Sequence, residues 1–315
     1  MNLVTLSSEE VQRLLDPEAL LAALGEAFKA LSAGLVDAPD RIGVSVPAAG
    51  FLLAMPAYQR DQEIAVKLVS VFPGNGRLGL PTHQALICMF DPTSGTPLAI
   101  MDGTAITALR TAGAAALSTR LLARVEARVL AIIGAGVQGR SHLLMLSHVR
   151  PFDEIRIASR EATNAERLAA TASGARAVES AEEAVRGADV VCLCTDSSEP
   201  VISHDWLAPG THVTSVGYAP PGGELDPSVI EHGRLFVETR LAFEPPPTGC
   251  AELSGRDPRT GTELGQVLLG SGLGRQSDDE VTVYKAMGHA CEDLAAASLV
   301  YGRAQREGVG RVVAL

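Results

Sequence analysis

Three glycines at fixed spacing are the first residues whose types could do chemistry. Gly134, Gly136 and Gly139 follow an apolar run and precede a predicted helix in VLAIIGAGVQGR. Gly134 would permit a tight turn, Gly136 would let the backbone approach a pyrophosphate, and Gly139 would let the helix pack closely on its strand. Free amides at a helix N-terminus bind phosphate, so the spacing predicts a dinucleotide site. Its expected contacts are Gly134, Ala135, Gly136, Val137, Gln138 and Gly139.

The end of the next predicted strand indicates which nicotinamide cofactor binds. This strand ends in IRIASR, so Ser159 and Arg160 stand where an NAD site usually has Asp or Glu. A hydroxyl and a guanidinium would bind a 2′-phosphate through charge-assisted hydrogen bonds, whereas a carboxylate would repel it. We expect NADP(H) to be preferred and NAD(H) to be possible, with Glu161 as the residue that could weaken the preference.

Three basic residues before this loop lie in apolar or Gly/Pro-rich surroundings. Lys67 lies in IAVKLVSVFPGN, Arg110 in AITALRTAG, and Arg41 at the start of RIGVSV. A lysine on a strand could simply point to solvent. Arg110 lies on a predicted helix of small and apolar residues, and a buried guanidinium needs an anionic partner. A substrate carboxylate would supply one through two parallel hydrogen bonds, so we predict an oxidoreductase that acts on a small anion, with Lys67 as a candidate acid or base.

The segments that must position these residues alternate regularly between strand and helix after Arg128. Strands are predicted at 129–133, 154–159, 175–178, 189–195, 212–216 and 234–237, and helices at 138–148, 162–172 and 180–186. Strands alternating with helices of these lengths predict an α/β fold, a Rossmann doubly wound parallel sheet.

The remainder of the chain has a different pattern of apolar, Pro and Gly residues. Residues 8–31 have apolar positions at helical spacing and predict one or two helices, with a possible break at Pro17. Short apolar runs separated by Pro and Gly between 41 and 100 predict an antiparallel or mixed sheet. A helix of small residues is expected at 103–122. We also predict helical structure throughout Asp279–Gln305, with Glu292 and Asp293 in dimer or domain contacts.

Composition disfavours several classes of protein. Hydrophobic residues make up 46% of the 315 residues, charged residues 20%, and the formal net charge is -11. This charge, with no basic tract, opposes binding to nucleic acid. The N-terminus lacks the pattern of a secretory signal, and the longest apolar stretch is much shorter than the ~20 residues of a spanning helix. We expect a cytoplasmic protein with neither nucleic acid nor membrane as a partner.

The five cysteines do not form a metal-binding pattern. They are odd in number and scattered, and the pair Cys192 and Cys194 lies in the strand-like run ADVVCLCT. Metal binding would need further ligands at fixed spacing. We expect small buried core residues in a reducing compartment, and no metal.

Several blocks of sequence, in the same order, resemble the ornithine cyclodeaminase/μ-crystallin family, and the resemblance runs nearly end to end. The blocks are MPAY at 55–58, KLVSVFPGN at 67–75, LPTH at 80–83, DPTSGTPLAIMDG at 91–103, ALRTA at 108–112, GAGVQG at 134–139, GYAPPGGELD at 217–226 and QSDDEVTVYKAMGHACEDLA at 276–295.

This resemblance implies two domains. Residues 1–118 and 287–315 would form a discontinuous α/β substrate-binding and dimerisation domain, and residues 119–286 the NAD(P)-binding Rossmann domain. A homodimer would form through the sheet of the first domain.

The resemblance also implies roles for individual residues. Arg41, Lys67 and Arg110 would line the substrate pocket, with the arginines holding an α-carboxylate and Thr82 nearby. The resemblance implies that Thr111, the 134–139 loop and the end of the fourth strand near Thr195 contact the cofactor, in addition to Ser159 and Arg160 predicted above.

Two departures from the family pattern bear on the reaction. Cyclodeaminases of the family carry an Asp after the VGG-like turn and a Glu two residues before the MP motif, but this chain has Ala219 and Leu53 there. Both losses remove carboxylates that would suit a diamino acid. The end of IRIASR also departs from the acidic ending of the NAD-recycling cyclodeaminases.

The leading hypothesis is therefore an NADPH-dependent reductase of cyclic imino acids, such as Δ1-pyrroline-2-carboxylate or Δ1-piperideine-2-carboxylate, which would yield proline or pipecolate. Lys67 would act at the imine nitrogen as proton donor or polarising cation. The alternatives are an ornithine cyclodeaminase or alanine dehydrogenase of the same family, and a non-catalytic protein that binds NADPH and a small ligand.

Overall fold

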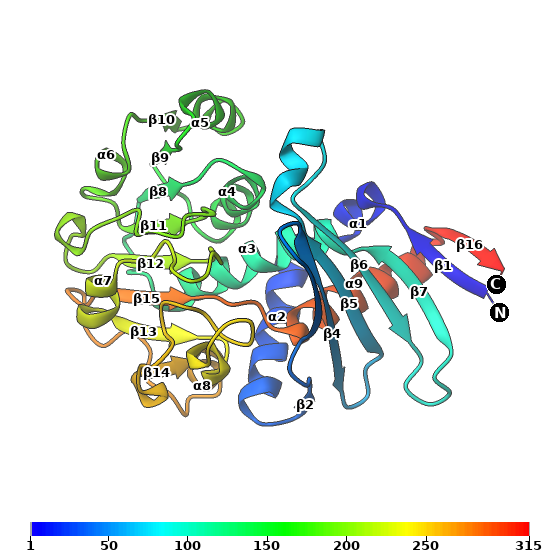
Figure 1. The fold of residues 1–315 in the computed structure, drawn as a ribbon. Helices are drawn as coiled ribbons and strands as arrows, with labels where there is room; N and C mark the ends of the chain where they lie inside the picture. The colour runs from blue at the N-terminus through cyan, green and yellow to red at the C-terminus, as the bar shows by residue number, and fades with distance from the viewer. Residues whose placement is uncertain (1, 315) are drawn as a thin grey trace. The chain divides into compact units, whose positions relative to one another are not determined.

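The computed structural model describes residues 2–314, and the chain divides into two compact units. One unit joins the residues up to Arg110 to those from His289 onward, and the other is Thr111–Gly288. Each unit contains its own eight-stranded sheet (Figure 1). The first unit is therefore discontinuous in sequence, and the second is continuous.

The continuous unit is a parallel sheet with helical crossovers. Its elements are α3 (Gly103–Leu122, whose first part belongs to the other unit), β8 (Val129–Ile133), α4 (Val137–Val149), β9 (Glu154–Ala158), α5 (Ala162–Ala169), β10 (Ala175–Ala177), α6 (Ala181–Val185), β11 (Val190–Leu193), β12 (His212–Ser215), α7 (Pro227–His232), β13 (Arg234–Val237), β14 (Gly261–Glu263), α8 (Leu264–Leu268) and β15 (Thr282–Lys285).

The strand order β10-β9-β8-β11-β12-β15-β13-β14 confirms the doubly wound prediction, and every neighbouring pair is parallel. The chain moves outward from β8 to β9 and β10, then returns to place β11 on the other side of β8. Ligands of such sheets bind where the order reverses, outside the carboxyl ends of the strands. That point lies between β8 and β11.

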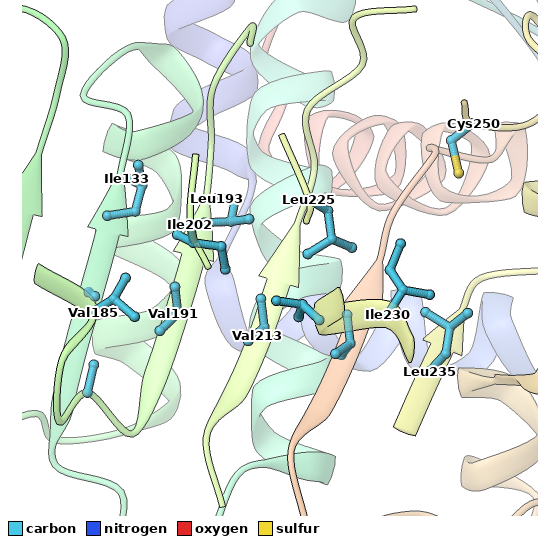
Figure 2. Close-up of a cluster of buried hydrophobic side chains, with 14 of the residues drawn as sticks. Ile133, Val185, Val191, Leu193, Ile202, Val213, Leu225, Ile230, Leu235 and Cys250 are labelled. Carbon is cyan, nitrogen blue, oxygen red and sulfur yellow. The ribbon is translucent and has the colours of Figure 1, made fainter. Parts of the chain in front are cut away.

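The core of this unit consists of aliphatic side chains on neighbouring parallel strands. Figure 2 shows Ile133, Val191 and Val213 on adjacent strands, and Ile230 of α7 belongs to the same cluster nearer to Leu235. Strands covered on both faces read as continuous apolar runs rather than alternating ones. This explains why β11 is buried at all four positions.

One sequence prediction is wrong in this unit. Helical structure was expected throughout Asp279–Gln305, but Thr282–Lys285 forms β15, which lies between β12 and β13. The helix begins only at Ala290. The run VTVY has the β-branched and aromatic residues that favour strands, and the apolar positions of the following helix masked that signal.

The discontinuous unit is a mixed sheet with helices. Its elements are β1 (Asn2–Leu6), α1 (Ser8–Leu14), α2 (Pro17–Ser32), β2 (Val36–Asp37), β3 (Ile42–Val46), β4 (Gly50–Gln59), β5 (Ile64–Val71), β6 (His83–Phe90), β7 (Pro97–Asp102), the first part of α3, α9 (Ala290–Glu307) and β16 (Arg311–Ala314).

This sheet has the order β16-β1-β7-β6-β5-β4-β2, and β3 also pairs with β4. Within the described strands of this sheet, β1 and β7 pair in parallel and the other pairs are antiparallel. Side chains alternate between the faces of a strand, and in β5 the positions of Ala65, Lys67 and Val69 are buried. Helices α2 and α9 pack on each other and α9 lies against β4 and β5 (Figure 1).

No helix in the described part of the chain is both long enough and apolar enough to cross a membrane.

Candidate active site

Lys67 is buried in the middle of the discontinuous unit's sheet. It lies on β5 between Met55 of β4 and Ile87 of β6, and its side chain is only 2% exposed. The alternative that this lysine points to solvent is therefore wrong. A buried ammonium needs a partner, and the partner comes from α9.

Two carboxylates of α9 pair with the basic residues. Lys67 Nζ lies 2.6 Å from Asp293 Oδ2, and Arg110 Nε lies 3.1 Å from Asp293 Oδ1. Arg110 Nη1 lies 3.2 Å from Glu292 Oε2. All four side chains are buried. The anionic partner of Arg110 is thus present within the chain, and Glu292 and Asp293 contact this cluster rather than only another domain or a second copy.

The start of α9 explains why the acidic pair lies there. His289 is the N-cap, and its Nδ1 accepts from the Cys291 N–H at 3.2 Å. Glu292 Oε1 accepts from the His289 N–H at 2.6 Å, which completes a capping box. Acidic residues in a first helical turn also interact favourably with the helix dipole. Glu292 therefore links the helix start to Arg110.

Arg110 is positioned from its own helix. Asp102 Oδ1 accepts from the Ala105 N–H at 2.7 Å, and Thr104 Oγ1 accepts from the Ala85 N–H at 3.0 Å. A Cβ on Gly103 would lie 2.9 Å from Ala85, so only glycine allows the helix to start this close to β6. These contacts fix the first part of α3 on the sheet that carries Lys67.

The charges of this cluster shift the pKa of Lys67. Burial lowers that pKa most strongly, Asp293 raises it and Arg110 lowers it, and the balance lies at about 8. For Asp293, burial alone would raise the pKa, but Lys67 and Arg110 outweigh burial and the pKa lies below its usual value. The cluster therefore holds a lysine that can give up and regain its proton near neutral pH, beside a carboxylate that stays charged.

Arg41 and His289 lie at the edge of this cluster. Arg41 immediately precedes β3. Burial and then the charge of Arg41 lower the pKa of His289 to about 4, with further contributions from Arg110 and Lys67. The imidazole is therefore neutral at pH 7, and because Nδ1 accepts a hydrogen bond, its proton lies on Nε2.

Thr82 lies further along the sheet. Its carbonyl accepts from the Phe72 N–H at 2.9 Å, which closes the connection between β5 and β6. Lys67 pairs with Ile87, five positions along from Thr82. The ion-paired group formed by Lys67, Arg110 and the two acidic residues of α9 does not include it.

The glycine loop of the other unit has the geometry that a dinucleotide requires. Gly134 has φ +104°, a left-handed conformation that favours glycine. A Cβ on Gly139 would lie 2.0 Å from the Gly134 carbonyl oxygen, so α4 can pack this closely only with glycine. A Cβ on Gly136 would meet nothing within 4 Å. The open side of Gly136, at the N-terminus of α4, fits an approaching pyrophosphate.

The neighbouring loop residues complete the N-terminus of α4. Ala135 is buried, Val137 is exposed and opens the helix, and Gln138 follows it. The first turn contains no acidic residue. An anion at this helix end would therefore meet no repelling carboxylate of the turn itself.

The other predicted cofactor contacts are distributed over three elements. Ser159 and Arg160 follow β9, with Ser159 partly buried and Arg160 exposed, and Glu161 is the N-cap of α5. Thr111 is 8% exposed on α3. Thr195 follows β11, and both its N–H and its hydroxyl donate to Glu224 Oε2 at 2.7 Å.

Several buried polar residues of these sites were not identified from the sequence. From the sequence, Glu292 and Asp293 were placed in dimer or domain contacts, and His289 and Glu224 were given no role. Asp226 caps α7, since its Oδ1 accepts from the Ser228 N–H at 2.6 Å. Burial distinguishes these acids, and composition alone does not reveal it.

The cysteines are free, and Cys192 and Cys194 are buried as predicted. Within residues 2–314, no group of three or more His, Cys, Asp or Glu side chains is arranged to hold a metal ion.

Comparison with known proteins identifies relatives along the whole chain. The ketimine reductase mu-crystallin of Mus musculus is 40% identical over 305 residues, covering 94% of this chain and 96% of the relative. The structure of Thermococcus litoralis Δ1-pyrroline-2-carboxylate reductase in complex with NADH and L-proline superimposes with a TM-score of 0.92 at 32% identity, covering 98% and 99% of the two chains. An archaeal alanine dehydrogenase dimer with bound NAD has a TM-score of 0.90 at 30% identity over the full length of both chains.

The sequence model of the ornithine cyclodeaminase/mu-crystallin family matches residues 1–308. The match covers both units and includes Lys67, Arg110 and the glycine loop. This chain belongs to the ornithine cyclodeaminase/mu-crystallin family.

Proposed function

We propose that this chain, an oxidoreductase that acts on C–N bonds, reduces cyclic imino acids such as Δ1-pyrroline-2-carboxylate and Δ1-piperideine-2-carboxylate, with NADPH as the preferred reductant. The observation that carries the proposal is the buried Lys67, which pairs with Asp293 at 2.6 Å and has a pKa lowered to about 8. Efficient general acids have a pKa near the working pH.

Lys67 is the proton donor in this proposal. The cofactor, when bound, supplies a hydride to the carbon of the C=N bond. The ammonium of Lys67 gives its proton to the imine nitrogen, which becomes the secondary amine of the product. Asp293 keeps Lys67 protonated at neutral pH, because its negative charge raises the pKa of the lysine. Solvent then returns a proton to Lys67.

The arginines bind the substrate carboxylate. Glu292 and Asp293 hold the Arg110 guanidinium at two of its nitrogens, which fixes the orientation of its plane. Arg41 contributes a second positive charge near the same cluster. A planar guanidinium binds a carboxylate with two parallel hydrogen bonds. Holding the substrate in a fixed orientation by its carboxylate can lower the activation barrier of the reduction by several kcal/mol.

The preference for NADPH rests on the exposed end of β9. Ser159 and Arg160 can approach a 2′-phosphate there. The Thermococcus relative is described with NADH and the archaeal alanine dehydrogenase with NAD, so the proposed preference rests on Ser159 and Arg160 of this chain alone. Michaelis constants for NADPH and NADH, measured with the same imino acid, test the preference, and a lower value for NADH would contradict it.

Leu53 favours imine reduction over cyclodeamination, because its side chain lies on the same face of the sheet as Lys67. Met55 pairs with Lys67, and Leu53, two residues earlier, lies on the same face of β4. At this position the cyclodeaminases that the sequence resembles carry a glutamate. An apolar side chain there suits a ring without a second amino group.

The deciding experiment is a substrate panel. The purified chain with NADPH is mixed with cyclic imino acids and with keto acid and amine mixtures, and loss of reduced nicotinamide absorbance is followed. Imine reduction supports the proposal. Ammonia released from ornithine identifies a cyclodeaminase, pyruvate formed from alanine identifies an alanine dehydrogenase, and cofactor binding without turnover identifies a binding protein. Each of these outcomes contradicts the proposal.

The sheet face opposite Lys67 supports a homodimer as the working form. Exposed apolar side chains lie there on three strands, namely Ile42, Val44, Val46, Leu52 and Leu86. Val44 pairs with Leu52, and register places all five on the face that α9 does not cover. Contiguous exposed apolar surface marks interaction sites. A second copy of this chain fits it, as in the dimeric archaeal relative.

A further inference from the structure

Glu224 is a buried carboxylate that none of the preceding chemistry uses. It is 0% exposed and accepts five hydrogen bonds. Its Oε2 accepts from the N–H and the hydroxyl of Thr195, both at 2.7 Å. Its Oε1 accepts from Ser215 Oγ at 3.0 Å, Val216 N at 3.1 Å and Gly217 N at 2.6 Å.

These donors lie at the ends of two neighbouring parallel strands. Thr195 follows β11, and Ser215 to Gly217 end β12. The carboxyl ends of β8 and β11 flank the point where the strand order reverses, which is where such sheets bind dinucleotides. Glu224 therefore joins the end of β12 to the end of β11, the strand that borders this point.

Close packing links Thr195 directly to the glycine loop. A Cβ on Gly134 would lie 3.2 Å from Thr195 Cγ2 and 2.5 Å from the Cys194 carbonyl oxygen. A Cβ on Gly217 would lie 2.6 Å from Glu224 Cδ. Because Gly134 and Gly217 have no side chain, Thr195 and Glu224 can pack directly against their backbones. A change at Glu224 would therefore reach Gly134 through a single residue, Thr195.

A carboxylate suits this set of contacts. Three of its five partners are backbone N–H groups, which can only donate, and the other two are hydroxyls. Ser215 Oγ also accepts from Lys285 Nζ at 3.1 Å, which places a positive charge one side chain away from Glu224. Lys285 donates in addition to the Gly217 carbonyl at 2.8 Å and to Glu252 at 2.7 Å. A buried charge is tolerated when hydrogen bonds and a counter-charge surround it in this way.

We propose that Glu224 is a positioning residue of the dinucleotide site. It holds Thr195 and the Val216–Gly217 backbone in place beside β11, where the strand order reverses. The bound cofactor would then contact a fixed surface there. The inference rests on the proposed cofactor site and is independent of the proposed substrate. It applies equally to NADPH and NADH.

The test compares two buried glutamates of the same sheet. Glu238, at the end of β13, is also 0% exposed and accepts from Tyr284 Oη, Met287 N and Gly288 N. It matches Glu224 in burial and donors but lies several strands away from β8. Glu224→Gln and Glu238→Gln each turn one accepting oxygen into a donating amide.

Binding of NADPH and NADH is measured by fluorescence titration without substrate, together with thermal unfolding. We expect Glu224→Gln to raise the Kd for both nucleotides by about tenfold to a hundredfold, since one accepting contact becomes a clash between donors. Glu238→Gln should lower the unfolding temperature but leave the Kd within about twofold, because distant sites act independently. A folded Glu224→Gln protein with the wild-type Kd overturns the proposal, as does an equal loss of affinity in Glu238→Gln.

If Glu224→Gln does not fold, Glu224→Asp decides. The shorter side chain keeps the charge but withdraws from Thr195, so we expect weaker binding of nucleotide, and an unchanged Kd would contradict the inference. The titration contains no imino acid, so it tests the nucleotide site separately from the reaction. A wild-type chain that binds NADPH but reduces no imine would refute the proposed reaction and leave this inference standing. A wild-type chain that binds neither nucleotide would refute this inference as well.

Discussion

Lys67 Nζ and Asp293 Oδ2 lie 2.6 Å apart, and each side chain is only 2% exposed. One residue comes from the central strand β5 and the other from the first turn of α9, near the C-terminus. Chain ends that fold into one unit thus supply opposite charges to one buried site. Burial and Arg110 lower the pKa of Lys67 while Asp293 raises it, and the balance lies at about 8.

The first prediction concerns the pH dependence of catalysis. Imine reduction needs the ammonium form of Lys67, so kcat/KM should fall above pH about 8, by about tenfold per pH unit. Oxidation of the product amine needs the neutral lysine, so its kcat/KM should rise through the same pH. Lys67→Met should remove this inflection and lower the rate of reduction by about 10²–10⁴-fold. A folded Lys67→Met enzyme with full activity would remove Lys67 from the mechanism.

The second prediction concerns Asp293. Its charge raises the pKa of Lys67, so Asp293→Asn should move the inflection of the reduction profile to lower pH and lower the rate at neutral pH. Loss of the Asp293 charge also removes the carboxylate that pairs with the buried Lys67, at a cost of about 3–5 kcal/mol in the free energy of unfolding.

A control for Asp293 is a carboxylate directly before β5 that contacts the same helix. Glu63 accepts from Ser298 Oγ of α9 at 2.7 Å, so Glu63→Gln perturbs another carboxylate against α9 without touching Lys67. We expect its pH profile to match the wild type. An inflection that stays in place in Asp293→Asn would mean that Asp293 does not set the protonation of Lys67.

Much of the fold could be predicted because local pattern and tertiary structure agree. The glycine loop lies between β8 and α4, and the strands at 154, 189, 212 and 234 form where apolar runs predicted them. The prediction failed at β15, where a four-residue strand directly precedes a long helix. Short terminal strands such as β1 and β16 were also missed, because they depend on pairing with each other across the whole length of the chain.

The candidate site was less predictable, and for a different reason. Lys67 and Arg110 could be singled out because a charge in an apolar segment is unusual. Glu292, Asp293 and Glu224 could not, since acidic residues near helix starts and in loops are usually solvated. What makes these acids special is the donors around them, which come from segments far away in sequence.

The third prediction addresses cofactor choice. Arg160 is exposed at the end of β9, where a guanidinium would bind a 2′-phosphate. Arg160→Ala should raise the KM for NADPH by about tenfold to a hundredfold, the size expected for loss of a charge-assisted contact, and leave the KM for NADH unchanged. Glu161→Gln should lower the KM for NADPH modestly. Equal effects of Arg160→Ala on both nucleotides would show that this residue does not read the phosphate.

The last prediction concerns the exposed sheet face of the discontinuous unit. Val44 is 67% and Ile42 69% exposed on β3, on the face opposite Lys67. Burial of a valine contributes about 1.5–3 kcal/mol, and twofold symmetry would count each substitution twice. Val44→Lys should therefore convert a dimer to monomers in light scattering after size exclusion. Leu269→Lys, which changes an apolar residue 49% exposed beyond α8, should leave the mass unchanged. A wild-type chain that is monomeric at micromolar concentration would contradict the assignment of this face to a second copy, and an unaffected dimer in Val44→Lys would place the interface elsewhere.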